Sequence, residues 1–170
     1  GQVREMEKGI LPIRMVNIGK CYRRQIDATH TPMFHQFEGL FVDRGVAVTH
    51  LKGVIDYFFR SYFGPERRAR LRPFHFRFTE PSFEVDISCS ACGGSGVRDG
   101  GKCRTCKSGW MELAGAGMVH PNVLRAGGID PSAYSGFAFG FGVERVLMMK
   151  AGISDIRLLY GNDLRWLQQW

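Results

Sequence analysis

The clearest pattern of apolar positions lies between residues 51 and 62, where apolar side chains recur at intervals of three and four. This spacing places them on one face of a helix, because an α-helix has about 3.6 residues per turn. The members are Leu51, Val54, Ile55, Phe58, Phe59 and Tyr62. The pattern predicts an amphipathic helix that ends at Gly64-Pro65 and packs its aromatic stripe into the core.

Other segments of the chain alternate apolar and polar residues or carry continuous apolar residues, as is typical of strands. They are residues 11–22, 34–40, 74–79, 84–87, 110–114 and 136–142. We also predict two short helices, one that opens the chain and stops at Gly9 and one over residues 143–151 that stops at Gly152. Because strands dominate and helices lie between them, we predict an α+β fold built around a mainly antiparallel sheet.

Two of these strands have unusual faces. In residues 136–142 the phenylalanines point one way, and the small residues Ala138, Gly140 and Gly142 point the other. A strand face with so few side chain atoms indicates that a ligand or another backbone comes close. Residues 74–79 place three phenylalanines on one face, which favours core packing on its own but also fits the wall of an apolar pocket.

Residues 22–40 gather arginines, two histidines, an aromatic ring, an amide and a carboxylate. We predict a hairpin with a loop at residues 27–32, because Asp, Thr and Pro shape such turns. On its second strand Phe34, Gln36 and Glu38 share one face. These three groups suit a small ligand with a flat ring and an ammonium group, whereas a half-buried core strand would carry apolar residues there.

Composition and charge narrow the classes of partner. The 170 residues contain no uninterrupted apolar run near the ~20 residues that span a bilayer, and no signal peptide opens the chain. We therefore expect a cytoplasmic protein with no membrane partner, and a piece of a longer chain because Gly1 stands within a helical pattern. The formal charge of +7 suits nucleic acid or nucleotide phosphate as a partner, although a basic surface unrelated to function fits equally well. We expect the basic residues 67–72 to form a solvated connection.

Four cysteines form a C-x2-C-x10-C-x2-C pattern with many glycines between the pairs. They are Cys89, Cys92, Cys103 and Cys106. Two such pairs bring four thiolates within reach of one Zn²⁺ in a closed, structural site. Two disulfides, one redox pair and four unconnected thiols are the alternatives. Disulfides fit poorly with a chain that lacks secretory features. We predict a zinc knuckle at residues 88–109, inserted in a domain that spans residues 1–170, and we expect the fifth cysteine, Cys21, to be a small buried residue.

The two knuckles also resemble the cysteine-rich repeats of J-domain chaperones. That resemblance implies a rival function, a zinc-dependent module that binds exposed polypeptide. Chaperones of this kind carry several such pairs between domains, whereas this chain has enough cysteines for one zinc ion and places them between two strands. The rival is therefore the weaker hypothesis.

The hairpin and residues 136–145 together resemble the second and third signature motifs of class II aminoacyl-tRNA synthetases. Three further segments narrow the resemblance to the α-subunit family of bacterial phenylalanyl-tRNA synthetases: residues 74–84, 115–124 and 128–130. The motifs occur in the right order and cover nearly the whole chain. Some bacterial members of this family also carry a cysteine insert at this point.

The resemblance implies an antiparallel sheet flanked by helices and a reaction in two steps. Phenylalanine attacks the α-phosphate of ATP to give phenylalanyl-adenylate, and the acyl group then passes to the terminal ribose of tRNA(Phe). Mg²⁺ accompanies ATP, and a separate β subunit completes a heterotetramer of two α and two β chains. Neither step needs a covalent enzyme nucleophile, so catalysis depends on positioning and on neutralising charge at phosphate.

The resemblance also assigns the nucleotide-binding residues. Arg23 binds the α-phosphate, Phe34 stacks under adenine, and Arg145 covers the opposite face of adenine and reaches phosphate. The two arginines carry the catalytic role, because a planar guanidinium suits phosphate oxygens. His30 is expected to touch the outer phosphates, or else to be an ordinary turn histidine. Glu112 is assigned to Mg²⁺, with a strand-edge carboxylate as the alternative.

A second set is assigned to the amino acid. The polar members hold its ammonium group and are Gln36 and Glu38, with Gln2 beside them. The apolar members contact its ring and are Phe76 and Phe78, with Ala138 as the floor of the pocket. Aromatic side chains pack edge to face with such a ring.

The chain departs from the family pattern at several points. Gln25 stands where an acidic residue is usual, and Arg77 and Phe83 replace smaller residues near the pocket. The first motif, which forms the dimer interface, and the N-terminal arm that contacts tRNA are absent. Two alternatives therefore stay open: the fragment is inactive alone, or it belongs to a synthetase-like paralogue that binds nucleotide or amino acid without aminoacylation.

Overall fold

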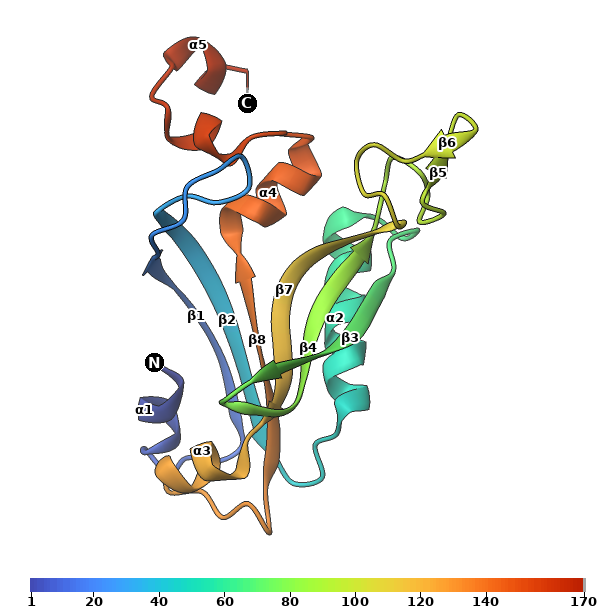
Figure 1. Ribbon diagram of the computed structural model, residues 1–170. Helices are drawn as coiled ribbons and strands as arrows, with labels where there is room; N and C mark the ends of the chain where they lie inside the picture. The colour runs from blue at the N-terminus through green and yellow to red at the C-terminus, as the bar shows by residue number, and fades with distance from the viewer. Residues whose placement is uncertain (170) are drawn as a thin grey trace.

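A single six-stranded antiparallel sheet forms the body of the molecule in the computed structural model, which describes residues 1–169 (Figure 1). Its strands lie in the order β1-β2-β8-β7-β4-β3. Their bounds are β1 Ile13–Tyr22, β2 Met33–Asp43, β3 Ala69–Phe76, β4 Thr79–Ser88, β7 Trp110–Val119 and β8 Ser135–Gly142. Between β4 and β7 a small two-stranded sheet, β5 Val97–Arg98 and β6 Gly101–Lys102, projects away from the body. The predicted α+β class is confirmed.

The helices are distributed unequally around this sheet (Figure 1). The long helix α2 covers one face, which we call the back, while α1 and α3 lie together at one end of the sheet. The others follow β8 and lie at the opposite end. The bounds are α1 Gln2–Met6, α2 Val48–Phe63, α3 Pro121–Ala126, α4 Val143–Ala151, the 3₁₀ helix η1 Ile156–Tyr160 and α5 Leu164–Leu167. None of the helices within residues 1–169 combines the length and apolar character that crossing a membrane requires.

The core lies between α2 and the back of the sheet. The predicted helical stripe is confirmed at Leu51, Ile55 and Phe59, which are buried, whereas its member Val54 is exposed. Phe58 meets Phe141 of β8 edge to face at a centroid distance of 5.3 Å. The aromatic side of β8 therefore anchors the sheet to α2, and its small residues are left on the front face.

Two predictions about residues 67–79 were wrong. Residues 74–79 are not one strand, because β3 ends at Phe76 and a tight turn leads into β4 at Thr79. The basic stretch is not only a solvated connection either, since it enters β3 at Ala69. There Arg70 and Arg72 bind the buried carboxylate of Asp86. A charged strand edge of this kind lacks the apolar alternation that marks a strand in the sequence.

Cys21 departs from its predicted burial. It lies in β1 but is only half-buried, and its Sγ lies 3.6 Å from Oε1 of Gln36. β1 is the edge strand of the sheet, which leaves its side chains partly uncovered. This placement puts Cys21 beside the candidate site.

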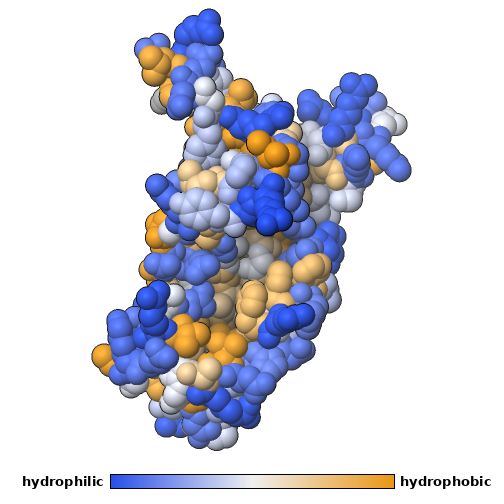
Figure 2. All heavy atoms as spheres, turned by 60° about the vertical axis from the view of Figure 1, so that its left-hand side comes forward, coloured by the Kyte–Doolittle hydropathy of each residue, from blue (hydrophilic) through white to orange (hydrophobic). Residues whose placement is uncertain are grey.

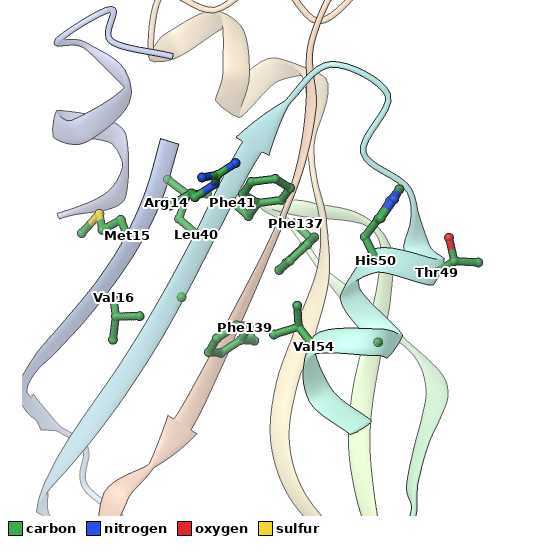
Figure 3. A pocket seen from close by; sticks show the side chains of 12 residues that line it. Arg14, Met15, Val16, Leu40, Phe41, Thr49, His50, Val54, Phe137 and Phe139 are labelled. Atoms are coloured by element: carbon green, nitrogen blue, oxygen red, sulfur yellow. The ribbon is translucent and has the colours of Figure 1, made fainter. Parts of the chain in front are cut away.

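The back of the sheet also bears a broad apolar groove between β1, β2 and the start of α2 (Figure 3). Its volume is about 620 Å³, and Val16, Phe41, Val54 and Phe139 are among the side chains that line it. The groove is separated by the sheet from the small-residue face of β8. It is therefore distinct from the front cavities described next.

Candidate active site

The floor of the front face is built from residues with little or no side chain. Glycine at position 140 lets the Gln36 side chain cross β8, because a Cβ there would lie 2.2 Å from Nε2 of Gln36. Glycine at position 115 likewise makes room for Phe76, whose Cζ would lie 2.9 Å from an added Cβ. The bare strand face that the sequence predicts is therefore filled in part by neighbouring side chains and leaves hollows between them.

An apolar cavity of about 370 Å³ lies on this floor. Phe76 and Phe78 form one wall, with their rings stacked at a centroid distance of 5.6 Å and an interplanar angle of 12°. Ala138 contributes to the lining as expected. Figure 2 shows a hollow bordered by apolar side chains on one face of the molecule. The volume suits one small apolar side chain with its backbone groups.

Three of the polar side chains that border this cavity were expected at the amino acid site. They are Gln2, Gln36 and Glu38. Nε2 of Gln2 lies 3.4 Å from Oε2 of Glu38, which joins α1 to β2. One carboxylate beside two amides provides acceptors for an ammonium group.

A second, more polar cavity of about 200 Å³ adjoins the first on the same face. Arg23, Phe34 and Arg145, which were assigned to the nucleotide, line it together with Glu112, which was assigned to Mg²⁺. The guanidinium of Arg23 lies over the Phe34 ring, with Cζ 4.4 Å from the centroid. Burial and the nearby positive charge of Arg145 both lower the pKa of Arg23. An anion placed between the two arginines would relieve this repulsion, so the cavity favours negatively charged ligands.

The two cavities adjoin. Both are lined by Gln36, Gly115 and Gly140, so these residues form the boundary that the cavities share. The arrangement therefore offers an apolar compartment, a polar middle and an arginine-lined compartment along one face of the sheet. A ligand with an apolar ring at one end and a phosphate at the other matches this order.

Glu144 is the residue of the site that sequence reasoning missed. It is 6% exposed, and both carboxylate oxygens accept from the backbone N–H of His35, at 2.8 and 3.0 Å. Tyr160 donates its hydroxyl to the same carboxylate. Burial raises the pKa of Glu144, but the hydrogen bonds from Tyr160 and His35 outweigh it, and the pKa is lowered overall.

This contact network fixes α4 to the start of β2 and so holds Arg145 beside Arg23 and Phe34. The signal in the sequence was the position of Glu144 next to Arg145, at the start of a short helix. Without the fold, nothing linked it to His35, which is 109 residues away.

Other assigned residues lie outside the cavities. His30 lines neither, and its Nδ1 lies 2.8 Å from Oδ2 of Asp27 within the loop. Gln25 and Arg77 are exposed, and Phe83 packs against the core cluster on the back of the sheet. The three departures from the family pattern therefore leave the cavity walls unchanged, while the predicted contact of His30 with phosphate stays a prediction.

Glu112 belongs to a chain of charges across β3, β4 and β7. Its Oε1 lies 3.7 Å from Nη1 of Arg145, and its Oε2 lies 3.8 Å from Nη2 of Arg72. Arg72 in turn pairs with Glu84. These separations are long and Glu112 is half exposed, so its carboxylate is free to turn toward a cation beside a bound phosphate.

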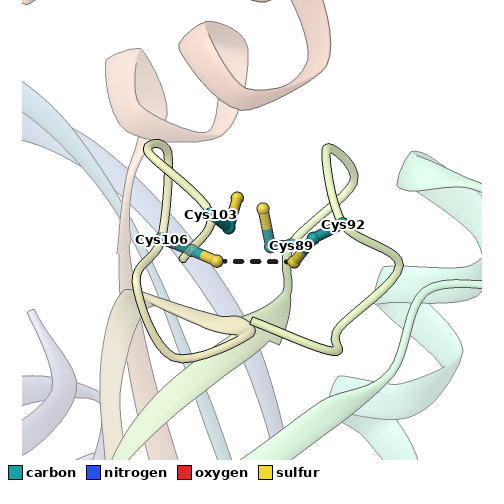
Figure 4. Close-up of side chains that lie close together, drawn as sticks. All are labelled: Cys89, Cys92, Cys103 and Cys106. Carbon is teal, nitrogen blue, oxygen red and sulfur yellow. Dashed lines mark hydrogen bonds between the residues drawn. The ribbon is translucent and has the colours of Figure 1, made fainter. Parts of the chain in front are cut away.

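The four cysteines of the insert converge at one point (Figure 4). Their Sγ atoms all lie within 4.8 Å of one another, and those of Cys92 and Cys106 are 3.5 Å apart. Backbone N–H groups of Gly96 and Gly109 donate to Cys92 and Cys106, at 3.3 and 3.2 Å. Tetrahedral coordination with Zn–S bonds near 2.3 Å places sulfur atoms about 3.8 Å apart, so the donor set fits one zinc ion.

Comparisons with known proteins show which family the chain belongs to. A sequence model of the family described as tRNA synthetases class II core domain (F) matches residues 1–170. The phenylalanine--tRNA ligase alpha subunit of Caldanaerobacter subterraneus subsp. tengcongensis is 54% identical over 171 residues, which is 99% of this chain and 49% of the relative. The corresponding subunit of Clostridium botulinum is 56% identical over the same shares. The chain thus spans about half the length of the curated relatives it matches.

A solved structure shares the fold at lower identity. A pyrrolysyl tRNA synthetase of Desulfitobacterium hafniense superposes with a TM-score of 0.57 and 21% identity, covering 91% of this chain and 48% of that one. At this identity the likeness supports the fold alone. It agrees with the antiparallel sheet and flanking helices described above.

Proposed function

The chain belongs to the family of class II tRNA synthetase core domains, and on that premise we propose that its parent protein activates phenylalanine with ATP and transfers it to tRNA(Phe). The observation that carries the proposal is the pair of joined cavities on the front face. Their order of apolar, polar and cationic walls matches phenylalanyl-adenylate from ring to phosphate. The relatives named as phenylalanine--tRNA ligase alpha subunits support the choice of amino acid.

In the proposed complex the phenylalanine ring lies against Phe76 and Phe78 over Ala138. Its ammonium group is held by Gln36 and Glu38, with Gln2 fixing the Glu38 carboxylate. An aromatic ring in this compartment gains about 0.5–1.5 kcal/mol from ring–ring contacts beyond its burial. The carboxylate of the amino acid then points toward the arginine-lined cavity.

The nucleotide occupies the second cavity. Adenine stacks against Phe34, while Arg23 and Arg145 bind the α-phosphate from two sides. Attack of the phenylalanine carboxylate places further negative charge on that phosphate, and the two guanidinium groups stabilise it. Preorganised charges of this kind make the largest contribution to the rate enhancement of many enzymes. Pyrophosphate leaves, and the ribose hydroxyl of tRNA later attacks the acyl carbon, which breaks the acyl–phosphate bond and releases AMP.

Two metal ions belong to the proposal. Glu112 would help to hold Mg²⁺ beside the phosphates, where the ion supplies charge neutralisation. The four cysteines would hold one structural Zn²⁺, because their geometry fits a closed tetrahedral site with no position left for substrate. The parent protein is expected to work with a separate β subunit, as the names of its relatives as alpha subunits suggest.

Phenylalanine-dependent exchange between ATP and pyrophosphate tests the proposal, using the full-length protein with its partner subunit. We expect exchange with phenylalanine and at least 100-fold less with tyrosine, whose hydroxyl has no partner in the apolar wall. No exchange, or exchange without amino acid preference, would contradict it. The absence of exchange would point instead to a paralogue that binds ATP or phenylalanine without forming the adenylate.

A further inference from the structure

The cysteine lobe, defined as residues 89–109 with Arg60, Arg67 and Arg68 beside it, carries much of the positive charge of the chain. Its seven basic side chains and one acidic side chain, Asp99, give a formal charge of +6. Counting the adjacent Glu66 lowers this to +5, and the whole chain has +7. The basic members are Arg60, Arg67, Arg68, Arg98, Lys102, Arg104 and Lys107. Figure 1 shows the insert projecting beyond the sheet, and Figure 2 shows a largely hydrophilic surface there.

Most of these cations have no carboxylate partner within residues 1–169. Arg98 pairs with Asp99 at 3.6 Å, and both side chains are exposed, so this pair contributes little. In the neighbouring strand β3, by contrast, Arg70 and Arg72 are bound to Asp86 and hold the sheet together. The cations of the lobe are thus available to an external anion, while those of β3 are not.

Part of the positive charge of the lobe balances the negative charge that four cysteine thiolates around one Zn²⁺ would carry. Four thiolates with one Zn²⁺ leave a charge of −2. The Cys89 thiolate raises the pKa of Arg67, although burial lowers it overall. A guanidinium nitrogen of Arg68 lies 3.1 Å from the Cβ position of Gly94, against the first knuckle. With these two arginines set against the cluster, an excess of +3 faces outward.

The cations of the lobe line two polar hollows. One, of about 580 Å³, is bordered by Arg60, Arg67 and Arg68 together with the first knuckle. The other, of about 480 Å³, is bordered by Arg98, Lys102 and Arg104. Two cationic hollows on one lobe suit successive phosphates of a polyanion better than a single small anion.

The lobe stands at the same end of the sheet as the phosphate-binding cavity. β7 leaves the lobe at Trp110, and Glu112, two residues along that strand, lines the cavity. The loop of residues 23–32 and helix α4 lie at this end as well (Figure 1). An RNA that brings its terminal ribose to the adenylate therefore passes close to the lobe.

We propose that the cysteine lobe binds the sugar-phosphate backbone of the acceptor arm of tRNA through its unpaired cations. The inference rests on the proposed function for the identity of the RNA. An acidic surface of a partner subunit is the competing occupant. The two cationic hollows and the position of the lobe near the phosphate cavity favour RNA, because charged and small side chains line the hollows rather than the apolar core that protein interfaces bury.

The test uses the full-length protein with its partner subunit and the double variant Lys102→Gln with Arg104→Gln. Both side chains are exposed and make no ion pair within the described residues, so folding should be unaffected. The matched control, Arg4→Gln with Arg125→Gln, removes the same charge from exposed positions on α1 and α3 at the other end of the sheet. Zinc content and melting temperature are measured for each protein.

Binding of a tRNA(Phe) transcript, and of a hairpin that copies its acceptor arm, is measured between about 50 and 200 mM salt. The lobe variant should bind both RNAs roughly tenfold more weakly, and the slope of log affinity against log salt should fall by about 1 to 2, because each lost phosphate contact removes about 0.7–0.9. The control should bind like the parent. Phenylalanine-dependent exchange, which needs no RNA, should be unchanged in both variants.

Equal RNA affinity of lobe variant and parent would overturn the inference, as would a loss seen with tRNA but not with the acceptor-arm hairpin. Dissociation of the subunits without loss of RNA affinity would assign the lobe to a protein partner and overturn it too. A parent protein without exchange activity would instead contradict the proposed function, so the two failures are distinguishable.

Discussion

The junction of the two cavities depends on the absence of a side chain at position 140, and Gly140→Ala tests that directly. The added Cβ would lie 2.2 Å from Nε2 of Gln36, so the amide has to move away from the cavities. The backbone at Gly140 does not have a positive φ, and the atom displaced is the flexible end of a side chain. We therefore expect little change in stability.

The expected effect is on phenylalanine. A hydrogen bond to a charged group contributes about 1.5–3 kcal/mol, and 1.4 kcal/mol is a factor of ten, so losing the Gln36 contact should raise KM for phenylalanine roughly 10- to 150-fold. The assay is ATP–pyrophosphate exchange in the full-length protein with its partner subunit. KM for ATP should change much less, because its binding residues lie mainly in the other cavity.

Two further variants identify the cause. Gly19→Ala adds a methyl group on β1, at the position that pairs with Gln36 of β2. Nothing lies within 4 Å of that methyl group, so this variant should behave like the parent. In a Gln36→Ala background, Gly140→Ala should have almost no further effect, because the side chain it displaces is gone. An undiminished effect in that background, or an unchanged KM in the single variant, would refute the reasoning.

The remaining predictions concern the Glu144 carboxylate that joins α4 to β2, the proposed zinc site and the floor of the apolar cavity. Glu144→Gln should destabilise the chain by roughly 1.5–3 kcal/mol in denaturant unfolding at pH 7, because it weakens a buried charged acceptor. The folded pKa of Glu144 is depressed, so this stabilisation is present above its unfolded pKa near 4.3 and is lost as pH falls through the folded pKa; a stability difference that grows toward acid would be inconsistent with it. Cys103→Ser should remove about one Zn²⁺ per chain in metal analysis and lower the melting temperature, whereas Cys21→Ser should do neither; retained zinc would rule out the four-thiolate site. Ala138→Val should raise KM for phenylalanine while leaving KM for ATP unchanged in the exchange assay, because the added methyl groups fill the apolar cavity; an equal change in both constants would argue for a general distortion.

The sequence predicted those parts of the structure that depend on local spacing. The α2 stripe, the one-sided strand β8 and the convergence of the four cysteines all follow from periodicity or ligand spacing, and the structure reproduces each. Most residues assigned through the motif resemblance line the two adjoining cavities of the front face, whereas His30 lines neither. Their individual roles stay predictions, since no ligand contact has been measured.

The predictions that failed concern features that depend on contacts between segments far apart in the sequence. The sequence gives no local sign that Arg70 and Arg72 share the carboxylate of Asp86, so a charged strand looked like a solvated connection. The turn after Phe76 is hidden in an alternating aromatic pattern. The role of Glu144 could not be predicted either, because its partner His35 comes near only when β8 pairs with β2.

The central claim is that the two front cavities form one site for an aminoacyl nucleotide. Calorimetry with a non-hydrolysable phenylalanyl-adenylate analogue tests it most directly, using the full-length protein with its partner subunit. The analogue should bind at least 100-fold more tightly than either phenylalanine or AMP alone, because it engages both cavities without a second loss of translational freedom. An analogue that binds no more tightly than AMP would contradict the claim.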